Sequence, residues 1–434
     1  MQQAINMGVN MMDTIMLGNL GEAQLSASSL ANTFYSVFNT LCLGVIGGCS
    51  VLAAQYWGAE NKEKCRETFS LAVRIIGVIA IAFGLVTYFA PRAVMRLYTD
   101  EEPVISAGIG YLKIMAFVYL IHGTAMVIAF LMRSVRAATL GLVVSIVSFV
   151  VNVVSNYALI FGKFGAPRLE IVGASLGTLI ARISEFLVTF GYIFFIDRRL
   201  ELKPRDFIKS PPKDLFVTYL KVGMPALISD GLIGVGASIM STVLGHMGAA
   251  VVSAQAVCQV VNRLFTVIVV GMASAAGVLT GNAIGRGDRE QAAEQAETFY
   301  WLGLVFGVLS AVMFFIFGNL SLSFYRLEDA TIGITRVLIR AHAFIIVFQC
   351  IQSIMTKGVL RGGGDTRFLM VADILFLWVL SLPLGALGAF VFKWPAWAVV
   401  ICLRADYIVK TFWCYRRMKS GKWMKRHAVN ASRA

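Results

Sequence analysis

The sequence predicts an all-α integral membrane protein, with twelve transmembrane helices in two pseudo-symmetric six-helix bundles around a central cavity. The first observation is composition: 58% of the 434 residues are hydrophobic, only 14% are charged, and the mean hydropathy is +0.76. Soluble domains carry about 45–50% apolar and about 25% charged residues. The other two observations are regularly spaced apolar runs and an echo of the first half of the chain in the second.

All but the first of the apolar runs are long enough to cross a bilayer, which takes about 20 residues of helix. The first run is shorter than the others and would span only about 27 Å at 1.5 Å per residue, so either the sequence starts late or its first helix is short on the entry side. The expected helices cover residues 1–18, 25–54, 67–90, 104–131, 139–162, 171–197, 215–244, 249–281, 293–318, 331–356, 368–391 and 396–416.

The basic residues predict the orientation of these helices. With an even number of helices both termini lie on one side, and the loops on that side hold most of the lysines and arginines, as in 198–213 and the tail after 416. An excess of Lys and Arg marks cytoplasmic loops. We therefore expect a multi-pass protein of the inner (plasma) membrane with both termini in the cytoplasm. The net charge of +14 is then a topology signal, and no nucleic-acid partner is expected.

No catalytic or metal-binding constellation is visible. The seven cysteines are scattered without a C-x-x-C pair, and the four histidines (122, 246, 342 and 427) are dispersed. A membrane enzyme would need a clustered nucleophile, base or metal set, and a channel would need rings of carbonyls or charges. The sequence therefore predicts no enzyme, no catalytic residue, no metal site and no cofactor.

An internal repeat divides the chain. Leu17-Gly18-Asn19-Leu20-Gly21 returns as Leu244-Gly245-His246-Met247-Gly248, and Gln55–Glu63 aligns with Asn282–Glu290 at the same offset. Six helices per repeat make the repeats parallel, and such paired bundles rock about a shared cavity in transporters. The predicted parts are an N-terminal lobe (1–197), a proline-bearing linker (198–214), a C-terminal lobe (215–416) and a basic cytoplasmic tail (417–434).

Three stretches carry a resemblance to a known family: Met12–Gly21, Ala54–Ala59 and Val359–Thr366. Together with the two halves, they make the chain similar to the multidrug and toxic compound extrusion (MATE) family, and most similar to its DinF-like branch. The resemblance implies an antiporter that exports amphiphilic, often cationic, compounds in exchange for H⁺ or Na⁺. It implies small-molecule cargo and membrane lipid as partners, and we expect a monomer.

The resemblance also assigns coupling residues in the first half. Asp13 matches the family's first-helix acid, and a buried carboxylate is poised to exchange a proton near neutral pH. Asn152 and Asn156 lie four apart on one helix face, where some relatives have Asn-x-x-x-Asp. Thr178 lies near the matching sixth-helix hydroxyl. Structural roles, such as interhelical packing by the amides, remain alternatives.

In the second half, the acids Asp230 and Asp373 are candidates for cation or substrate contact, because acids deep in a membrane are rarely idle. Asp230 follows Pro225, whose freed backbone group it would alternatively stabilise, and Ile233 replaces the glutamate that some sodium-coupled relatives carry. Tyr35 and Asn39 are candidates for the lining of the cavity, with core or lipid contact as the alternative.

Three further points complete the expectations. Arg182 and Glu185 should pair within one helix, three residues apart. Arg361 and Asp365 should pair across the inner ends of helices and hold a glycine-rich turn. The alternative function is a flippase for a lipid-linked precursor. Such a flippase would need a strongly basic cavity, whereas the acids Asp13, Asp230 and Asp373 favour cationic cargo.

Overall fold

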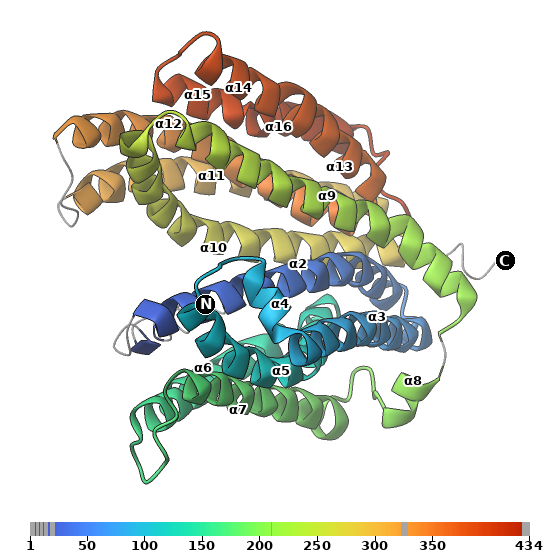
Figure 1. The fold of residues 1–434 in the computed structure, drawn as a ribbon. Helices are drawn as coiled ribbons and strands as arrows, with labels where there is room; N and C mark the ends of the chain where they lie inside the picture. The colour runs from blue at the N-terminus through green and yellow to red at the C-terminus, as the bar shows by residue number, and fades with distance from the viewer. Residues whose placement is uncertain are drawn as a thin grey trace. The chain divides into compact units, whose positions relative to one another are not determined.

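The computed structural model describes residues 5, 8, 12, 16–17, 22–209, 211–322 and 329–427, and every element in these ranges is helical (Figure 1). Within them, ten helices are long and apolar enough to cross a membrane. They match the second to eleventh predicted segments. The predicted first helix lies largely outside the described residues, and the twelfth consists of two shorter helices that meet at Arg404. The count of twelve therefore stays a prediction.

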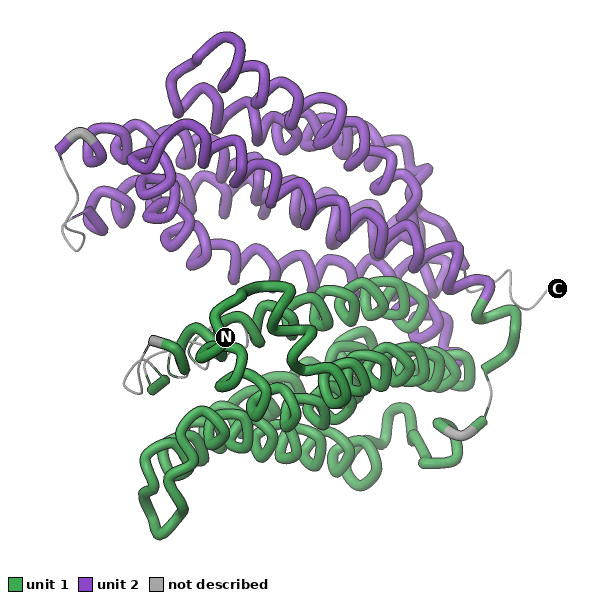
Figure 2. Tube along the Cα trace, in the orientation of Figure 1, with its two compact units in different colours: residues 1–53, 62–216 green, residues 54–61, 217–434 purple. Residues whose placement is uncertain are grey.

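The chain forms two compact units (Figure 2). Unit 1 comprises residues 1–53 and 62–216, and unit 2 comprises residues 54–61 and 217–434. The end of the first long helix is thus built into unit 2, although it precedes most of unit 1 in the sequence. The predicted lobe boundaries at 197/198 and 214/215 stay predictions.

Unit 1 is organised around α5, which is its most buried candidate span and packs against α3, α6 and α7. Large apolar side chains point away from this centre, as Phe89 and Phe195 do, as expected for helices that face lipid. The elements are α2 (Glu22–Gly58), α3 (Lys62–Phe89), α4 (Pro91–Arg96), α5 (Glu102–Ser134), α6 (Ala138–Phe161), α7 (Glu170–Gly191), the π-helical η1 (Tyr192–Ile196) and α8 (Pro204–Ile208).

Unit 2 is built on α10, which packs against α11, α12 and η3. Short π-helical stretches continue α12 and α13, so two of its membrane segments change helical pitch midway. The elements are α9 (Lys213–Gly245), α10 (Ala249–Arg286), α11 (Arg289–Ser321), α12 (Asp329–Ser353), η3 (Ile354–Leu360), α13 (Thr366–Asp373), η4 (Ile374–Ser381), α14 (Leu382–Phe390), α15 (Ala396–Leu403) and α16 (Ala405–Lys419).

The turn between α10 and α11 shows how local sequence ends and starts these helices. Gly287 has φ +87°, the left-handed conformation that closes a helix at low cost for glycine. Asp288 follows as the N-cap of α11, and its carboxylate accepts a hydrogen bond from the Gln291 N–H at 2.9 Å. A cap of this kind satisfies one of the free amides at a helix start. Two residues therefore reverse the chain direction.

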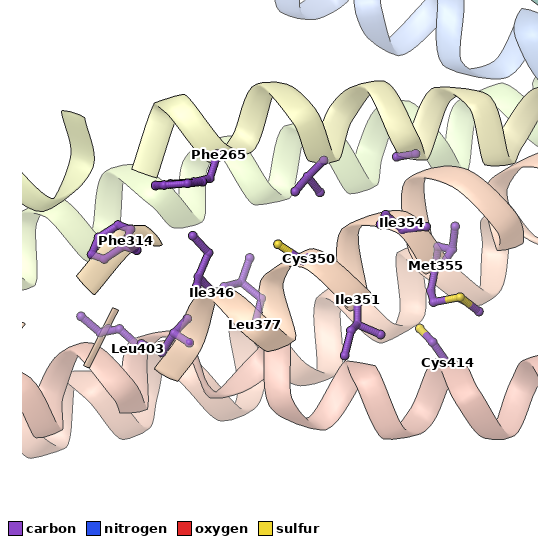
Figure 3. Close-up of a cluster of buried hydrophobic side chains, with 14 of the residues drawn as sticks. Phe265, Phe314, Ile346, Cys350, Ile351, Ile354, Met355, Leu377, Leu403 and Cys414 are labelled. Atoms are coloured by element: carbon purple, nitrogen blue, oxygen red, sulfur yellow. The ribbon is translucent and has the colours of Figure 1, made fainter. Parts of the chain in front are cut away.

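The core of unit 2 is a continuous apolar cluster between α10, α12, η4 and α15–α16 (Figure 3). Phe265, Ile346 and Leu377 meet there, and Leu403 and Cys414 extend it to the last two helices. The described cysteines are all free, and all except the half-buried Cys402 serve as small buried side chains. The cluster fixes the helices that carry the polar groups described next.

Two repeat-related segments meet in a reciprocal contact within unit 2. A Cβ added to Gly58 would lie 2.1 Å from the backbone oxygen of Asn282, and one added to Gly285 would lie 2.1 Å from the oxygen of Gln55. Gln55 and Asn282 occupy equivalent positions of the repeat, as do Gly58 and Gly285. An exchange of this kind, in which i meets j and j meets i, is the pattern of a two-fold contact. Glycine is required at both places.

Candidate functional site

Unit 2 holds a buried cluster of two carboxylates around one lysine. The Lys410 ammonium on α16 lies 2.6 Å from Asp373 Oδ1 at the end of α13 and 3.1 Å from Asp406 Oδ2 one turn earlier on its own helix. The Ser229 hydroxyl on α9 donates a hydrogen bond to Asp373. Lys410 is 1% exposed, and both acids are nearly as buried. Because two carboxylates share one ammonium, the cluster has a place for one more positive charge, such as a proton.

Asp230, the next residue on α9, forms a separate ion pair. Its two oxygens accept hydrogen bonds from Arg361 Nη1 and Nη2 at 3.1 and 2.9 Å, a bidentate arrangement. The alternative of an acid bound to backbone freed by Pro225 is therefore not what the structure shows. Asp230 and Asp373 belong to adjacent pairs, each bound to a basic side chain that the sequence patterns did not connect to it.

Arg361 and Asp365 both form ion pairs with residues of other segments, but the structure shows no pair between the two: Arg361 binds Asp230, and Asp365 binds the end of the chain. Asp365 is fully buried and contacts Arg417 Nε at 2.7 Å and Lys425 Nζ at 2.5 Å. Residues after α16 continue the contact: the Lys425 N–H donates to Gly363 O, and the Trp423 ring packs against Gly363. The first part of the predicted basic tail is therefore seated on the glycine-rich turn.

Unit 1 holds a second buried polar group, made of His122 on α5 and the pair Arg182–Glu185 on α7. Glu185 Oε2 accepts from Arg182 Nη1 at 2.7 Å and lies 3.2 Å from His122 Nδ1. The predicted pairing within the helix is confirmed. Tyr35 on α2 lies against this group, with its ring centroid 5.8 Å from those of His122 and Tyr119. Tyr35 thus belongs to an aromatic and ionic cluster of unit 1.

The two amides predicted on the fifth segment lie together. Asn156 Nδ2 donates to Asn152 Oδ1 at 3.3 Å, and both residues are buried on α6. Asn156 sits directly against Gly177 on α7, where an added Cβ would lie 2.0 Å from its Oδ1. Thr178 follows Gly177 and is half-buried, and Asn39 is half-buried on α2. Asp13 lies outside the described residues.

Sequence reasoning missed the basic partners. The i, i+4 spacing of Asp406 and Lys410 was available as a signal for an in-helix pair. Charged residues within a membrane segment are costly, so this pair could have been singled out as a functional candidate. His122 was noticed only as a dispersed histidine. Its proximity to Glu185 depends on how α5 packs against α7, which no spacing in the sequence encodes.

Comparisons with known proteins agree with this architecture. The family model MatE matches residues 1–158 and 225–387. The multidrug resistance protein NorM of Burkholderia vietnamiensis is 28% identical over 89% of this chain and 84% of its own length. The probable multidrug resistance protein NorM of Thermotoga maritima is 24% identical over all of this chain and 92% of its own.

Solved structures show the same fold. A crystal structure of MATE in the bent conformation superposes with a TM-score of 0.85 at 17% identity, over 97% of this chain and 93% of that chain. A MOP superfamily transporter from Pyrococcus furiosus gives 0.83 at 18% identity, over 97% and 94%. The family match covers well over half of the sequence, so the chain belongs to the MatE family of multidrug transporters.

Proposed function

We propose that the protein is a secondary active exporter of amphiphilic compounds, driven by entry of H⁺ or Na⁺ and operating by rocking of its two halves, in the DinF-like branch of the family. The observation that carries the coupling proposal is the Lys410 cluster. When one proton or cation binds to the two buried carboxylates, they no longer both depend on the Lys410 ammonium for charge compensation. A charge change in a buried group is the kind of local event that biases a two-state element.

Asp13 is the proposed coupling acid of the first half, with Asn152, Asn156 and Thr178 as its polar neighbours. Asn156 cannot titrate, so proton exchange among these four residues falls on Asp13. Asp373 and Asp230 are the proposed coupling acids of the second half. Asp230 is paired with Arg361, and the surplus negative charge of the Lys410 cluster is buried, so neither acid presents an exposed negative charge to a cationic cargo. The cargo proposal therefore rests on amphiphilic character.

Proteoliposomes with an imposed pH or Na⁺ gradient test the proposal. We expect efflux of an amphiphilic dye to follow one of the two gradients and to stop when that gradient is collapsed. Asp13→Asn should leave folded, membrane-inserted protein that still binds dye but loses gradient-driven export. Asn156→Asp should shift the pH dependence and keep export. Export by Asp13→Asn at the wild-type rate under both gradients would move the coupling site to Asp373 or Asp230.

A further inference from the structure

A polar cavity of about 280 Å³ lies in unit 2, between the last turns of α9, the early turns of α10, and α15. Its size is close to the lower end of the range for small-molecule sites. The polar lining consists of Arg404, Gln255, Gln259, Ser238 and Ser241, and the apolar lining includes Leu244 and Leu403. None of these residues takes part in the ion pairs described above.

Arg404 is the charged group of this cavity, and it stands at the break between α15 and α16. Its Nη1 donates to the Tyr407 hydroxyl at 2.9 Å, and its guanidinium lies over the Tyr407 ring, 5.3 Å from the centroid. Among the described residues it has no salt bridge. Asp406, two residues on, already pairs with Lys410. A guanidinium carries five N–H donors, so Arg404 keeps most of them for another partner.

The neighbouring amide adds a second donor. The His342 ring lies with Nε2 2.9 Å from Gln255 Oε1, and a carboxamide oxygen only accepts. His342 therefore donates to Gln255, which leaves the Gln255 NH₂ group to donate into the cavity. The Ser238 and Ser241 hydroxyls donate to carbonyls of their own helix, so toward a ligand they present acceptor lone pairs.

We propose that this cavity binds an anionic oxygen group, such as the carboxylate of an amphiphilic cargo, between Arg404 and Gln255. An intramembrane arginine without a carboxylate partner is costly, and a bidentate oxyanion is the partner that its planar fork fits best. The apolar side chains beside it accommodate the ring or chain that carries the group. The inference rests on the proposed export function only in treating the bound compound as cargo.

The test is equilibrium binding to the full chain, measured by fluorescence anisotropy in nanodiscs of phosphatidylcholine. The probes are rhodamine 110, which has a free carboxylate, and its methyl ester rhodamine 123. We expect the wild type to bind the acid about tenfold or more tightly than the ester. Arg404→Gln should abolish this preference, and Arg404→Lys should retain part of it, because a lysine keeps the charge but not the fork.

The matched control is Arg336→Gln, which removes an exposed arginine of α12 that does not line the cavity. It should keep the wild-type preference. Nanodiscs that contain phosphatidylglycerol separate two sources of the anion: loss of the preference there, in a protein that has it in phosphatidylcholine, shows a lipid phosphate competing at Arg404. The proposal would be overturned if the wild type bound acid and ester equally well, or if Arg404→Gln and the control Arg336→Gln lost the preference to the same extent. Because binding is measured without a gradient, its failure is distinct from failure of transport.

Discussion

At the scale of single residues, Lys410 is the side chain whose loss is expected to reduce stability most. It compensates two carboxylates at a site with almost no access to solvent. Removal of one partner from a buried ion pair leaves an uncompensated charge, whereas removal of the whole set is often tolerated. The cluster is therefore expected to respond very differently to single and combined substitutions.

Lys410→Met should destabilise the protein by about 3–5 kcal/mol, because Asp373 and Asp406 would face each other without the ammonium. The measurement is the thermal midpoint of the purified protein in one detergent. Lys410→Met combined with Asp373→Asn and Asp406→Asn should recover a large part of the loss. A Lys410→Met variant as stable as the wild type would contradict the view that the ammonium compensates both acids.

The sequence identified the acids Asp230 and Asp373 but not which basic residue each one binds. Asp230 and Asp373 stand out because an acid in an apolar run is conspicuous, yet their partners Arg361 and Lys410 lie far along the chain. An isolated charge signals a cost, but the residue that offsets it is fixed by helix packing. The Asn152–Asn156 contact needed only the pitch of one helix, so both amides were placed on the same face from spacing alone.

At the scale of elements, the end of the chain acts as a clamp on the glycine-rich turn. Gln55 on α2 donates to Lys425 O at 3.1 Å and accepts from the His427 N–H at 2.9 Å. The Arg426 guanidinium donates to Gly285 O at 3.0 Å. Backbone and side-chain contacts therefore join the tail to the ends of α2 and α10.

This clamp is expected to weaken in acid. Burial lowers the pKa of His427 below its usual 6.5; Lys425 and Lys221 act in the same direction, and Gly364 O and Asp365 oppose them. A histidine with a depressed folded pKa is neutral in both states at higher pH, so its contribution to docking is intact above about pH 6.5 and is lost as pH falls through the folded pKa. The protection of the amides of residues 421–427 against hydrogen exchange should fall as the pH decreases from about 6.5 through the folded pKa. His427→Gln should remove the dependence.

The reciprocal glycine contact gives a second prediction at this scale. Gly285→Ala should destabilise the protein by about 1–3 kcal/mol, the usual cost of overpacking, because its Cβ would meet backbone and not a movable side chain. Gly271→Ala on the same helix is the control, since a Cβ there meets no atom within 4 Å, and alanine is the better helix former by about 1 kcal/mol. Thermal midpoints that shift alike in both variants would contradict the contact.

At the scale of the whole molecule, the sequence predicts on which side of the membrane each loop lies. Lys209 lies in the predicted cytoplasmic linker and Lys393 in a predicted external loop, and both side chains are exposed. In a Cys402→Ser background, whose other cysteines are buried, Lys393→Cys should react with an impermeant maleimide in intact cells and Lys209→Cys should not. Labelling of Lys209→Cys from outside would reverse the topology.

Helix positions were predictable because each candidate span is a long apolar run bounded by charge or glycine, and the observed helices extend the predicted ones by a few residues into the loops. The break at Arg404 was not foreseen, although the charged residues Arg404, Asp406 and Lys410 interrupt the apolar run there. The π-helical stretches η3 and η4 were also not predicted, because the hydrophobicity of an apolar run does not distinguish α-helical from π-helical pitch.

The placement of residues 54–61 in unit 2 has a consequence for assembly. The end of α2 completes a packing surface whose other components come from the far half of the chain: Asn282, Gly362, Lys425 and His427. A gene split between residues 216 and 217 would therefore yield one polypeptide that contains all of unit 1 and a second that lacks part of unit 2. The first would carry away the eight residues that the second needs. Co-expressed fragments should consequently be recovered as a heterodimer, and Gly58→Trp in the shorter fragment should abolish their co-purification.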